Sequence, residues 1–397
     1  MKHAYNHLHR LKWLGIDTQQ ELVVFMSRNC NVCRAEGFQA LTRLMITHHS
    51  EAVIATLNVV DSDILRQDEI GLSESAWKKL NAAEGHLVAV SHLPPLHSMS
   101  HVRAKIYGRQ LDQQSFSEII NDITAEKYSN VFLSAFVSAC SGKMNTDEIC
   151  FLTRAMIESG NKMVWPEKII ADKHSIGGLP GNRVSMLLVP IIASLNITIP
   201  KTSSRAITSP SGTADTMEVI TNVNLDIRQM QKVVEQENGC LVWGGAAKMS
   251  PADDIIIRVE RALDIDSEEQ MIASIISKKA AAGTTHCVFD LPWGESAKIR
   301  THDDAVNFKS QLETVAAYAG IKVKSVITDG SQPVGFGIGP ALEARDVLRV
   351  LSNDPEMPIN LKEKSLMLTG ALLDMILDKP EGHGYILAKT QLESGAA

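Results

Sequence analysis

The chain of 397 residues lacks an excess of basic charge. Its 39 lysines and arginines are outnumbered by 46 aspartates and glutamates, which gives a formal net charge of −7. Proteins that bind nucleic acids generally present a basic surface. The balance therefore argues against nucleic acid as a partner, although it leaves room for a small anion held in a local pocket.

Long hydrophobic runs are also missing, because no apolar segment approaches the roughly 18 residues that span a bilayer. Residues 1–17 show neither a long apolar stretch nor a small-residue cleavage site, which argues against a secretory signal. The six cysteines are scattered rather than arranged as a disulfide framework. We therefore expect a reduced, cytoplasmic, globular protein with no membrane partner.

The N-terminal part of the chain is predicted to be rich in β-strands. Runs of β-branched residues bounded by turn residues predict strands at 21–26, 53–60 and 86–91. A short helix is predicted from Ser73, and the paired prolines of 92–99 predict a linker. We expect a small N-terminal β-rich domain at 1–97.

Helical periodicity begins near residue 115. Ser115 with Glu118 and Asn145 with Glu148 each match the capping box that opens a helix. The spacing predicts two or three short antiparallel helices over 115–160 and further helices over 250–282. These segments define a helical domain, expected at residues 98–165 and 250–285.

The strongest local pattern is a strand, a glycine-rich turn and a helix. A short buried strand is predicted at 168–172, followed by Lys-His-Ser-Ile-Gly-Gly and a helix over 182–195. This order places backbone N–H groups and a helix N-terminus against an anion. Lys173 would supply a cation, and Ser175 and Ser185 would supply hydroxyl donors. The glycine spacing fits neither a Walker loop nor a dinucleotide fingerprint.

A second loop is rich in hydroxyl groups. Seven serines and threonines lie between Thr202 and Thr213, with Arg205 among them. Such a cluster can coordinate phosphate or ribose oxygens without adding negative charge. The alternative is an ordinary solvated Ser/Thr loop, which the residues alone do not exclude.

The remaining segments complete an α/β pattern. Strands are predicted at 286–291 and 321–327, and helices at 340–351 and 361–377. We expect an α/β phosphate-binding domain at residues 166–249 and 286–397. The predicted fold class is α/β, in which a helical domain is interleaved with a mixed α/β domain and preceded by the β-rich domain.

Several longer motifs occur together in one order. They are Asp-Lys-His-Ser-Ile-Gly-Gly at 172–178, the loop at 203–215, Trp-Gly-Gly-Ala at 243–246, Ser-Pro-Ala-Asp-Asp at 250–254, Ala-Ser-Ile-Ile-Ser-Lys-Lys at 273–279 and Gly-Ile-Gly-Pro-Ala-Leu-Glu-Ala-Arg at 337–345. Over residues 100–397 the chain resembles the pyrimidine nucleoside phosphorylases of the thymidine phosphorylase family. The AMP phosphorylase-like branch is the most similar, and residues 1–97 look like that branch's extra domain.

The resemblance implies phosphorolysis of a pyrimidine nucleoside such as thymidine, which gives a pentose 1-phosphate and a free base. Inorganic phosphate would be a co-substrate, no cofactor or metal would be needed, and the enzyme would be a homodimer. The positions that match the family's phosphate-binding residues are Lys173, Ser175, Ser185, Ser203 and Thr213. His174 and Lys173 would act in catalysis, while Ser274 and Lys278 would contact the base.

The AMP-type branch implies an overlapping set of residues. The matching positions that would contact a nucleotide are Gly178, Ser204, Arg205, Ala206, Ile207, Thr208, Ser209, Thr213, Ser274 and Lys298. Asp266 matches the acid that would protonate the leaving base. A buried carboxyl group with a raised pKa suits that task.

Two departures from the thymidine enzymes leave the substrate open. The register of an arginine that binds a pyrimidine carbonyl is uncertain here, with Arg258 or Arg261 as its neighbour. After the strand at 286–291 the chain reads Leu-Pro-Trp-Gly-Glu-Ser-Ala-Lys, in which Lys298 could meet a 5′-phosphate. The alternatives are a nucleoside 5′-monophosphate phosphorylase that acts on AMP, CMP or UMP, a phosphoribosyltransferase, and a non-catalytic relative.

Three further features concern the C-terminus, the Cys-x-x-Cys pair and one pair of histidines. The resemblance implies a C-terminal subdomain of which this chain, ending at Ala397, lacks a part. One Cys-x-x-Cys pair, Cys30 and Cys33, has no second pair to complete a zinc site. His97 and His101 have helical spacing beside a proline linker, and we expect no metal there.

Overall fold

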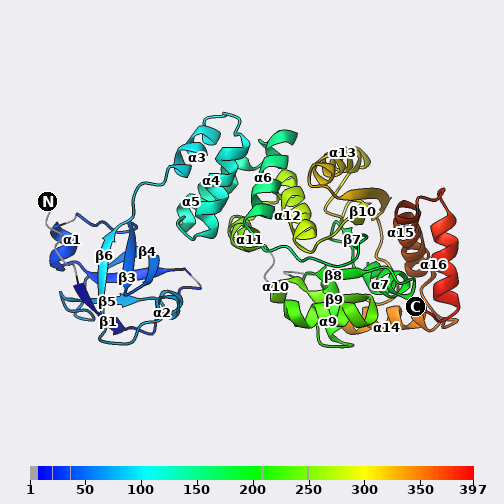
Figure 1. The fold of residues 1–397 in the computed structure, drawn as a ribbon, viewed down its shortest axis with the longest axis horizontal. Coiled ribbons are helices and arrows are strands. Elements are labelled where there is room, and N and C mark those ends of the chain that lie inside the picture. Colours follow the sequence, from blue (N-terminus) through cyan, green and yellow to red (C-terminus); the bar gives the residue numbers. More distant parts are fainter. Residues whose placement is uncertain (1–7, 20, 36, 207–209, 248–249) are drawn as a thin grey trace. The chain divides into compact units, whose positions relative to one another are not determined.

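Figure 1 shows the fold in a computed structural model that describes residues 8–397 apart from 20, 36, 207–209 and 248–249. The chain divides into two compact units. The first unit comprises Met1–Arg103 with Asp122–Ala135, and the second comprises Ala104–Asn121 with Phe136–Ala397. Each unit is described by itself.

The first unit contains a closed β-barrel, which confirms the predicted β-rich beginning. Its strands follow the spatial order β1-β5-β2-β4-β3-β6. They are β1 (Leu8–Trp13), β2 (Val23–Ser27), β3 (Arg43–His48), β4 (Glu51–Val60), β5 (Glu69–Leu72) and β6 (Leu87–His92). Inward-facing aliphatic side chains such as Leu44, Ile46 and Leu57 are fully buried. Closure removes the unpaired strand edges that would otherwise invite aggregation.

Two short helices accompany the barrel, α1 (Asn31–Ala35) and α2 (Glu74–Leu80). As predicted, α2 starts at Ser73, whose hydroxyl accepts the backbone N–H of Ala76. The strands β2, β4 and β6 match the three predicted ones, whereas β1, β3 and β5 were not predicted. In β1 and β3, buried residues alternate with more exposed ones, several of them charged or polar, and the β-branched signal is weak. β5 is only four residues long.

Six helices follow in two groups along the chain. They are α3 (Ser98–Ile106), α4 (Gln113–Thr124), α5 (Asn130–Cys140), α6 (Thr146–Glu158), α11 (Pro251–Leu263) and α12 (Glu268–Ala281). The capping box of Asn145 and Glu148 opens α6 as predicted. The one predicted at Ser115 is wrong, because α4 has already begun at Gln113 and the Asp112 carboxylate accepts the backbone N–H of Ser115 at 2.9 Å.

The rest of the second unit is α/β, and its strands are parallel. One sheet has the order β11-β10-β7, and a second pairs β8 with β9. The strands are β7 (Ala171–Ser175), β8 (Ile199–Ser203), β9 (Gly239–Trp243), β10 (His286–Trp293) and β11 (Lys322–Asp329). All but the last residue of β10 is buried, which is typical of a central strand covered on both faces.

Helices accompany these strands. They are α7 (Val184–Ser194), α8 (Thr213–Glu218), α9 (Ile227–Glu237), α10 (Gly244–Ala247), α13 (His302–Tyr318), α14 (Pro340–Leu351), α15 (Ile359–Leu377) and α16 (His383–Glu393). The almost entirely apolar α7 packs with α15 and α16 in one core cluster. Helices α7, α14 and α15 agree with the predicted ones, whereas α13 and α16 were not predicted.

Within the described residues, no helix is long and apolar enough to cross a bilayer. The five cysteines whose side chains are described, at positions 30, 140, 150, 240 and 287, are buried.

Candidate active site

The strand β7 carries the first group of predicted site residues. The prediction ended this strand at Asp172, but it runs over Ala171–Ser175, so Lys173 and Ser175 lie in the strand rather than in a loop. Lys173 is level with Val288 of β10, and Ser175 is level with Asp290. Lys173 and Ser175 by themselves predict a turn, but pairing with β10 extends the strand β7 over both residues.

Asp290 is the centre of a buried hydrogen-bond network. Its Oδ2 accepts the Ser175 hydroxyl at 2.7 Å and the Asn182 side-chain amide at 2.9 Å. Its Oδ1 accepts the Thr328 hydroxyl at 2.6 Å. The Lys364 ammonium lies 3.3 Å from Oδ2. This carboxylate therefore fixes both ends of the glycine-rich turn between β7 and α7.

The Asn182 amide leaves one polar atom unused. Its Oδ1 is buried and has no hydrogen-bond partner among the described residues. A buried unpaired acceptor is costly unless a bound molecule satisfies it. The described residues therefore leave this acceptor beside the turn open to a donor group.

Buried cations surround the same strand. Lys173, Lys201 and Lys279 are each less than 5% exposed. Lys279 is paired with Asp172 at 2.7 Å, whereas the Lys201 ammonium donates to the carbonyl of its own neighbour, Thr202. Burial, followed by Lys279, lowers the pKa of Lys201 to about 7. The site is therefore short of negative charge.

The arrangement keeps His174 neutral. Burial, followed by Lys279 and Lys201, holds the pKa of the His174 imidazole well below its ordinary value. Near pH 7 this ring therefore carries no positive charge. Its centroid lies 5.8 Å from that of the Phe289 ring.

The pH dependence of phosphate use is expected to follow Lys173. Burial lowers its pKa to about 8, with Asp290 opposing the shift and Lys364 adding to it. An ammonium attracts an anion and a neutral amine does not, so kcat/KM for phosphate should fall as the pH rises above about 8. Initial rates at limiting phosphate across pH 6–10 measure this. Lys173→Arg should move the falling limb to higher pH, and an unmoved limb would contradict the assignment.

The second predicted loop is fixed by an ion pair that the sequence analysis missed. The Arg183 guanidinium donates to Glu343 Oε2 at 2.5 Å, to the Thr213 hydroxyl at 3.2 Å and to the Ser211 carbonyl at 2.5 Å. The Ser211 hydroxyl also donates to Glu343 at 3.0 Å. Arg183 therefore ties the start of α7 to this loop and brings Thr213 towards Ser185, the second residue of α7.

Arg205 is held by carboxylates. Its guanidinium makes two hydrogen bonds to Glu218, at 2.5 and 2.6 Å, and lies 5.0 Å from the centre of the Trp243 ring. The hydrogen bond to Glu218 is the main reason that the pKa of Arg205 is raised. In this arrangement Arg205 shapes the loop. The predicted residues Ile207, Thr208 and Ser209 lie outside the described residues.

The same loop contains Ser203, Ser204 and Ala206. Ser203 is the last residue of β8. The Ser204 carbonyl accepts the backbone N–H of Ala214, and the N–H of Ala206 donates to Asp215 at 2.7 Å. These bonds join Ser204 and Ala206, at the described beginning of the Ser/Thr segment, to the start of α8.

Gly178 brings a third segment to the site. Its φ of +104° is a conformation that side chains rarely adopt, and a Cβ there would lie 3.2 Å from the backbone nitrogen of Lys298. Lys298 in turn forms an ion pair with Asp266 at 3.0 Å. Both side chains are largely exposed, at 44% and 64%. Asp266 therefore lies at the surface and not in a buried part of the site.

The predicted base side lies on α12. Lys278 forms an ion pair with the buried Asp253 of α11 at 2.8 Å. Ser274, one turn before Lys278, lines a cavity of about 10 Å³ between α11 and α12 together with Asp253 and Glu260. Arg258 and Arg261 are exposed.

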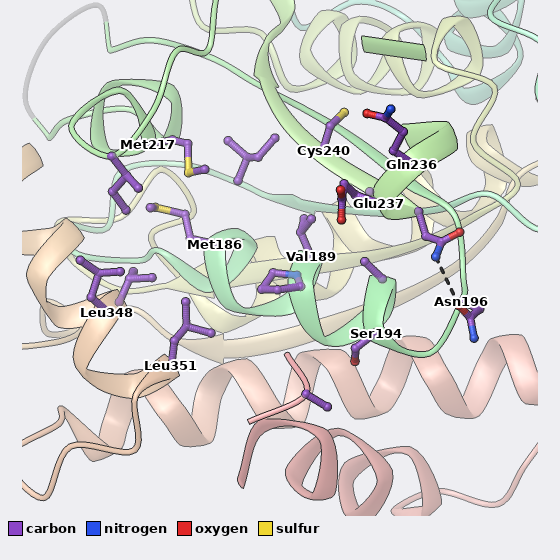
Figure 2. Close-up of a pocket in the computed structure, with 18 residues that line it drawn as sticks. Met186, Val189, Ser194, Asn196, Met217, Gln236, Glu237, Cys240, Leu348 and Leu351 are labelled. Atoms are coloured by element: carbon purple, nitrogen blue, oxygen red, sulfur yellow. Dashed lines mark hydrogen bonds between the residues drawn. The ribbon is translucent and has the colours of Figure 1, made fainter. Parts of the chain in front are cut away.

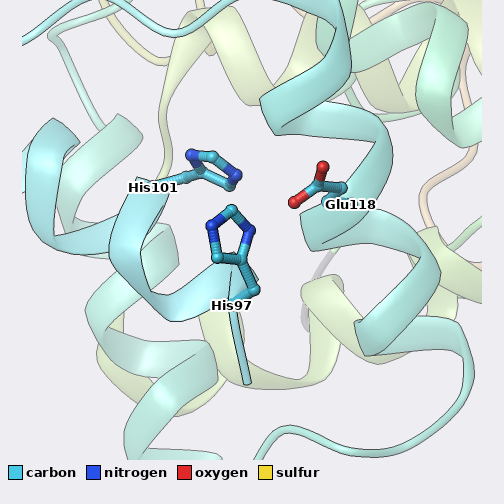
Figure 3. Close-up of side chains that lie close together, drawn as sticks. All are labelled: His97, His101 and Glu118. Carbon is cyan, nitrogen blue, oxygen red and sulfur yellow. The ribbon is translucent and has the colours of Figure 1, made fainter. Parts of the chain in front are cut away.

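Two of the sequence patterns, the histidine pair and the Cys-x-x-Cys pair, lie outside this site. Figure 3 shows His97 and His101, whose rings meet edge to face with centroids 5.1 Å apart. The Cys30 thiol is buried with its sulfur 4.0 Å from the His9 ring nitrogen Nε2, and the side chain of Cys33 is outside the described part.

A separate pocket of about 570 Å³ lies beside α7 (Figure 2). Met186, Val189, Met217, Leu348 and Leu351 give it a mainly apolar lining. None of the predicted site residues lines this pocket.

Sequence comparisons place two long segments of the chain in one family. Residues 167–397 match the glycosyl transferase family, a/b domain, and residues 100–160 match the glycosyl transferase family, helical bundle domain. A Legionella pneumophila (strain Philadelphia 1) protein called "Putative thymidine phosphorylase" is 52% identical over 389 residues, which are 98% of this chain and 75% of that protein. A Polaromonas protein of the same name is 50% identical over 98% of this chain and 77% of its own length.

A solved structure shows the same fold. Anthranilate phosphoribosyltransferase from Thermus thermophilus superposes with a TM-score of 0.62 at 17% sequence identity. The match covers 74% of this chain and 95% of that one. The chain therefore belongs to the glycosyl transferase family that joins a helical bundle domain to an a/b domain, and it is a pentosyltransferase.

Proposed function

We propose that the protein catalyses phosphorolysis of the N-glycosidic bond of a pyrimidine nucleoside such as thymidine. The observation that carries the proposal is the excess of buried positive charge beside β7. Five cations, Lys173, Arg183, Lys201, Lys279 and Lys364, lie among three carboxylates, Asp172, Asp290 and Glu343. If all were ionised, two positive charges would remain, which a phosphate dianion would balance.

The chain's own residues suggest how phosphate is held. The Lys173 ammonium supplies positive charge for the phosphate. In the described part of the chain, no carboxylate lies within 4 Å of it. The Ser175 and Ser185 hydroxyls lie at the two ends of the glycine-rich turn, and the start of α7 adds its dipole. Thr213, positioned by Arg183, closes the site from the second loop. Ser203 completes this set.

Attack of a phosphate oxygen on C1′ forms the new C–O bond as the C1′–N bond breaks. Ser274 and Lys278 hold the departing base on α12, and the neutral His174 contacts the sugar or the base. Enclosure of the reactants excludes water, which would otherwise hydrolyse the sugar. No metal or cofactor is required, and the enzyme works as a homodimer in this proposal.

One observation favours a nucleoside 5′-monophosphate as a second candidate substrate. Lys298, carried by the segment packed against Gly178, is 44% exposed and forms an ion pair with the exposed Asp266. Exchange of that carboxylate for a 5′-phosphate would cost little, because exposed ion pairs contribute at most about 1 kcal/mol.

A single panel tests both candidates. Nucleosides and nucleoside 5′-monophosphates are incubated with and without phosphate, and released base is measured. We expect base release that requires phosphate, with thymidine or uridine as the best substrates. A preference for AMP, CMP or UMP selects the second candidate. Base release that instead requires pyrophosphate and Mg²⁺ would contradict the proposal and indicate a phosphoribosyltransferase.

A further inference from the structure

One face of α11 carries two acids towards the base side of the site. Asp253, Ile256 and Glu260 are spaced by three and four residues and so share one helix face. All three line the small cavity that Ser274 of α12 also lines. Phe136, Leu152 and Met156 make the other walls apolar. Glu260 is thus the acid beside Ser274 that lies against a largely apolar surface.

Two of the three acids around this cavity form ion pairs with lysines, and the third, Glu260, forms none with any lysine that the structure describes. Lys278 is paired with Asp253 at 2.8 Å, and Lys298 is paired with Asp266 at 3.0 Å. In the described part of the chain, no cation lies within ion-pair distance of the Glu260 carboxyl. Glu260 is therefore the acid of this group that has no cation beside it among the described residues.

The titration of Glu260 agrees with this count. The pKa of Glu260 is raised to about 7, mainly by burial and also by the carboxylates of Asp253 and Asp266. Lys278 and Lys298 oppose this shift. A carboxyl group with a pKa near the working pH is suited to general acid catalysis. Asp266, by contrast, is 64% exposed and forms an ion pair with Lys298.

We propose that Glu260 is the catalytic acid that protonates the departing base, an inference that rests on the proposed phosphorolysis. The proton moves from the Glu260 carboxyl to the base as the C1′–N bond breaks and phosphate bonds to C1′. Lys278 and Lys298 then stabilise the resulting carboxylate, which regains a proton from water before the next turnover.

The test is Glu260→Gln, which keeps the size and hydrogen-bonding capacity of the side chain but removes the proton. We expect kcat near pH 7 to fall by about 10²–10³-fold. The wild-type kcat should fall as the pH rises above about 7, because Glu260 must be protonated to act as the acid. The Glu260→Gln variant should lose this alkaline limb of the pH profile. The fall in kcat caused by Glu260→Gln should be much smaller for a nucleoside of 5-fluorouracil than for the same nucleoside of uracil. The more acidic 5-fluorouracil can leave without full protonation.

Glu235→Gln on the exposed face of α9 makes the same chemical change elsewhere and should leave kcat unchanged. Glu260→Asp keeps the acid and should restore the alkaline limb even if its rate is reduced. If Glu260→Gln retains the wild-type rate and limb while Asp266→Asn loses both, the acid is Asp266 and this inference is overturned. If the wild-type protein releases no base with phosphate, the proposed function fails as well, so the two failures are distinguishable.

Discussion

Lys173→Met is expected to lower the rate of phosphorolysis by about 10⁴-fold while leaving the protein at least as stable as the wild type. The activity loss follows from the role proposed for the ammonium. One positioned cation is worth about 10³–10⁵ in rate where an enzyme stabilises charge on a phosphoryl group. Lys173 is 2% exposed, so solvent cannot replace the missing charge.

The stability effect has the opposite sign for the same physical reason. Burial lowers the pKa of Lys173 from the ordinary 10.5 to about 8. Between these two values the unfolded chain binds a proton that the folded protein does not, so wild-type stability should rise with pH across this window. Below pH 8 the full cost of the buried charge is present. Methionine is similar in length and uncharged, so it removes that cost.

Two measurements on one preparation check this prediction. Phosphorolysis rates at saturating phosphate report the activity, and urea unfolding at pH 7 reports the stability. Lys232→Met on the exposed face of α9 is the matched control and should change neither. A variant that is both inactive and unstable would show that Lys173 maintains the fold, and near-normal turnover would remove it from the phosphate site.

Local signals in the sequence predicted the frame of this site well. The glycine-rich turn, the helix after it and the capping box at Asn145 depend on residues close in the chain, and all three are found. The strand β7 was placed three residues too early, because Lys173 and Ser175 look like turn residues until β10 pairs with them.

The residues that hold the site together were missed for one shared reason. Asp290 meets Ser175 across 115 positions, and Arg183 meets Glu343 across 160. No spacing rule connects residues that far apart. A weaker signal was available for Asp290, since it is a single acid within a predicted buried strand, and such a group needs partners. Lys201 offered the same kind of signal at the end of an apolar segment.

Asp290→Ala is expected to be the most destabilising single change in the site. Asp290 is fully buried, and its removal leaves the ammonium groups of Lys173 and Lys364 without a counter-charge. Removing one partner of a buried ion pair costs about 3–5 kcal/mol. Ser175 and Asn182 also lose their shared acceptor, so the glycine-rich turn should lose its fixed geometry and activity should fall with stability.

The pH dependence gives this prediction a second readout. Although burial acts to raise the pKa of Asp290, Lys364 and Lys173 hold it below the ordinary value of 3.8. A carboxyl group with a lowered folded-state pKa contributes stability above its unfolded pKa and loses that contribution as the pH falls. Between pH 7 and pH 3 the wild type should therefore lose more stability than Asp290→Ala.

Thr328→Val is the matched control, because it removes one neutral hydrogen bond to the same carboxylate and keeps the charge. It should cost about 1 kcal/mol. Urea unfolding of the three proteins at pH 7 and pH 3 measures both effects. Equal costs for the two variants would mean that Asp290 acts only as a hydrogen-bond acceptor. A large excess for Asp290→Ala means that its charge balances the buried lysines. In that case phosphate should stabilise Asp290→Ala more than it stabilises the wild type, because the added dianion supplies the missing charge.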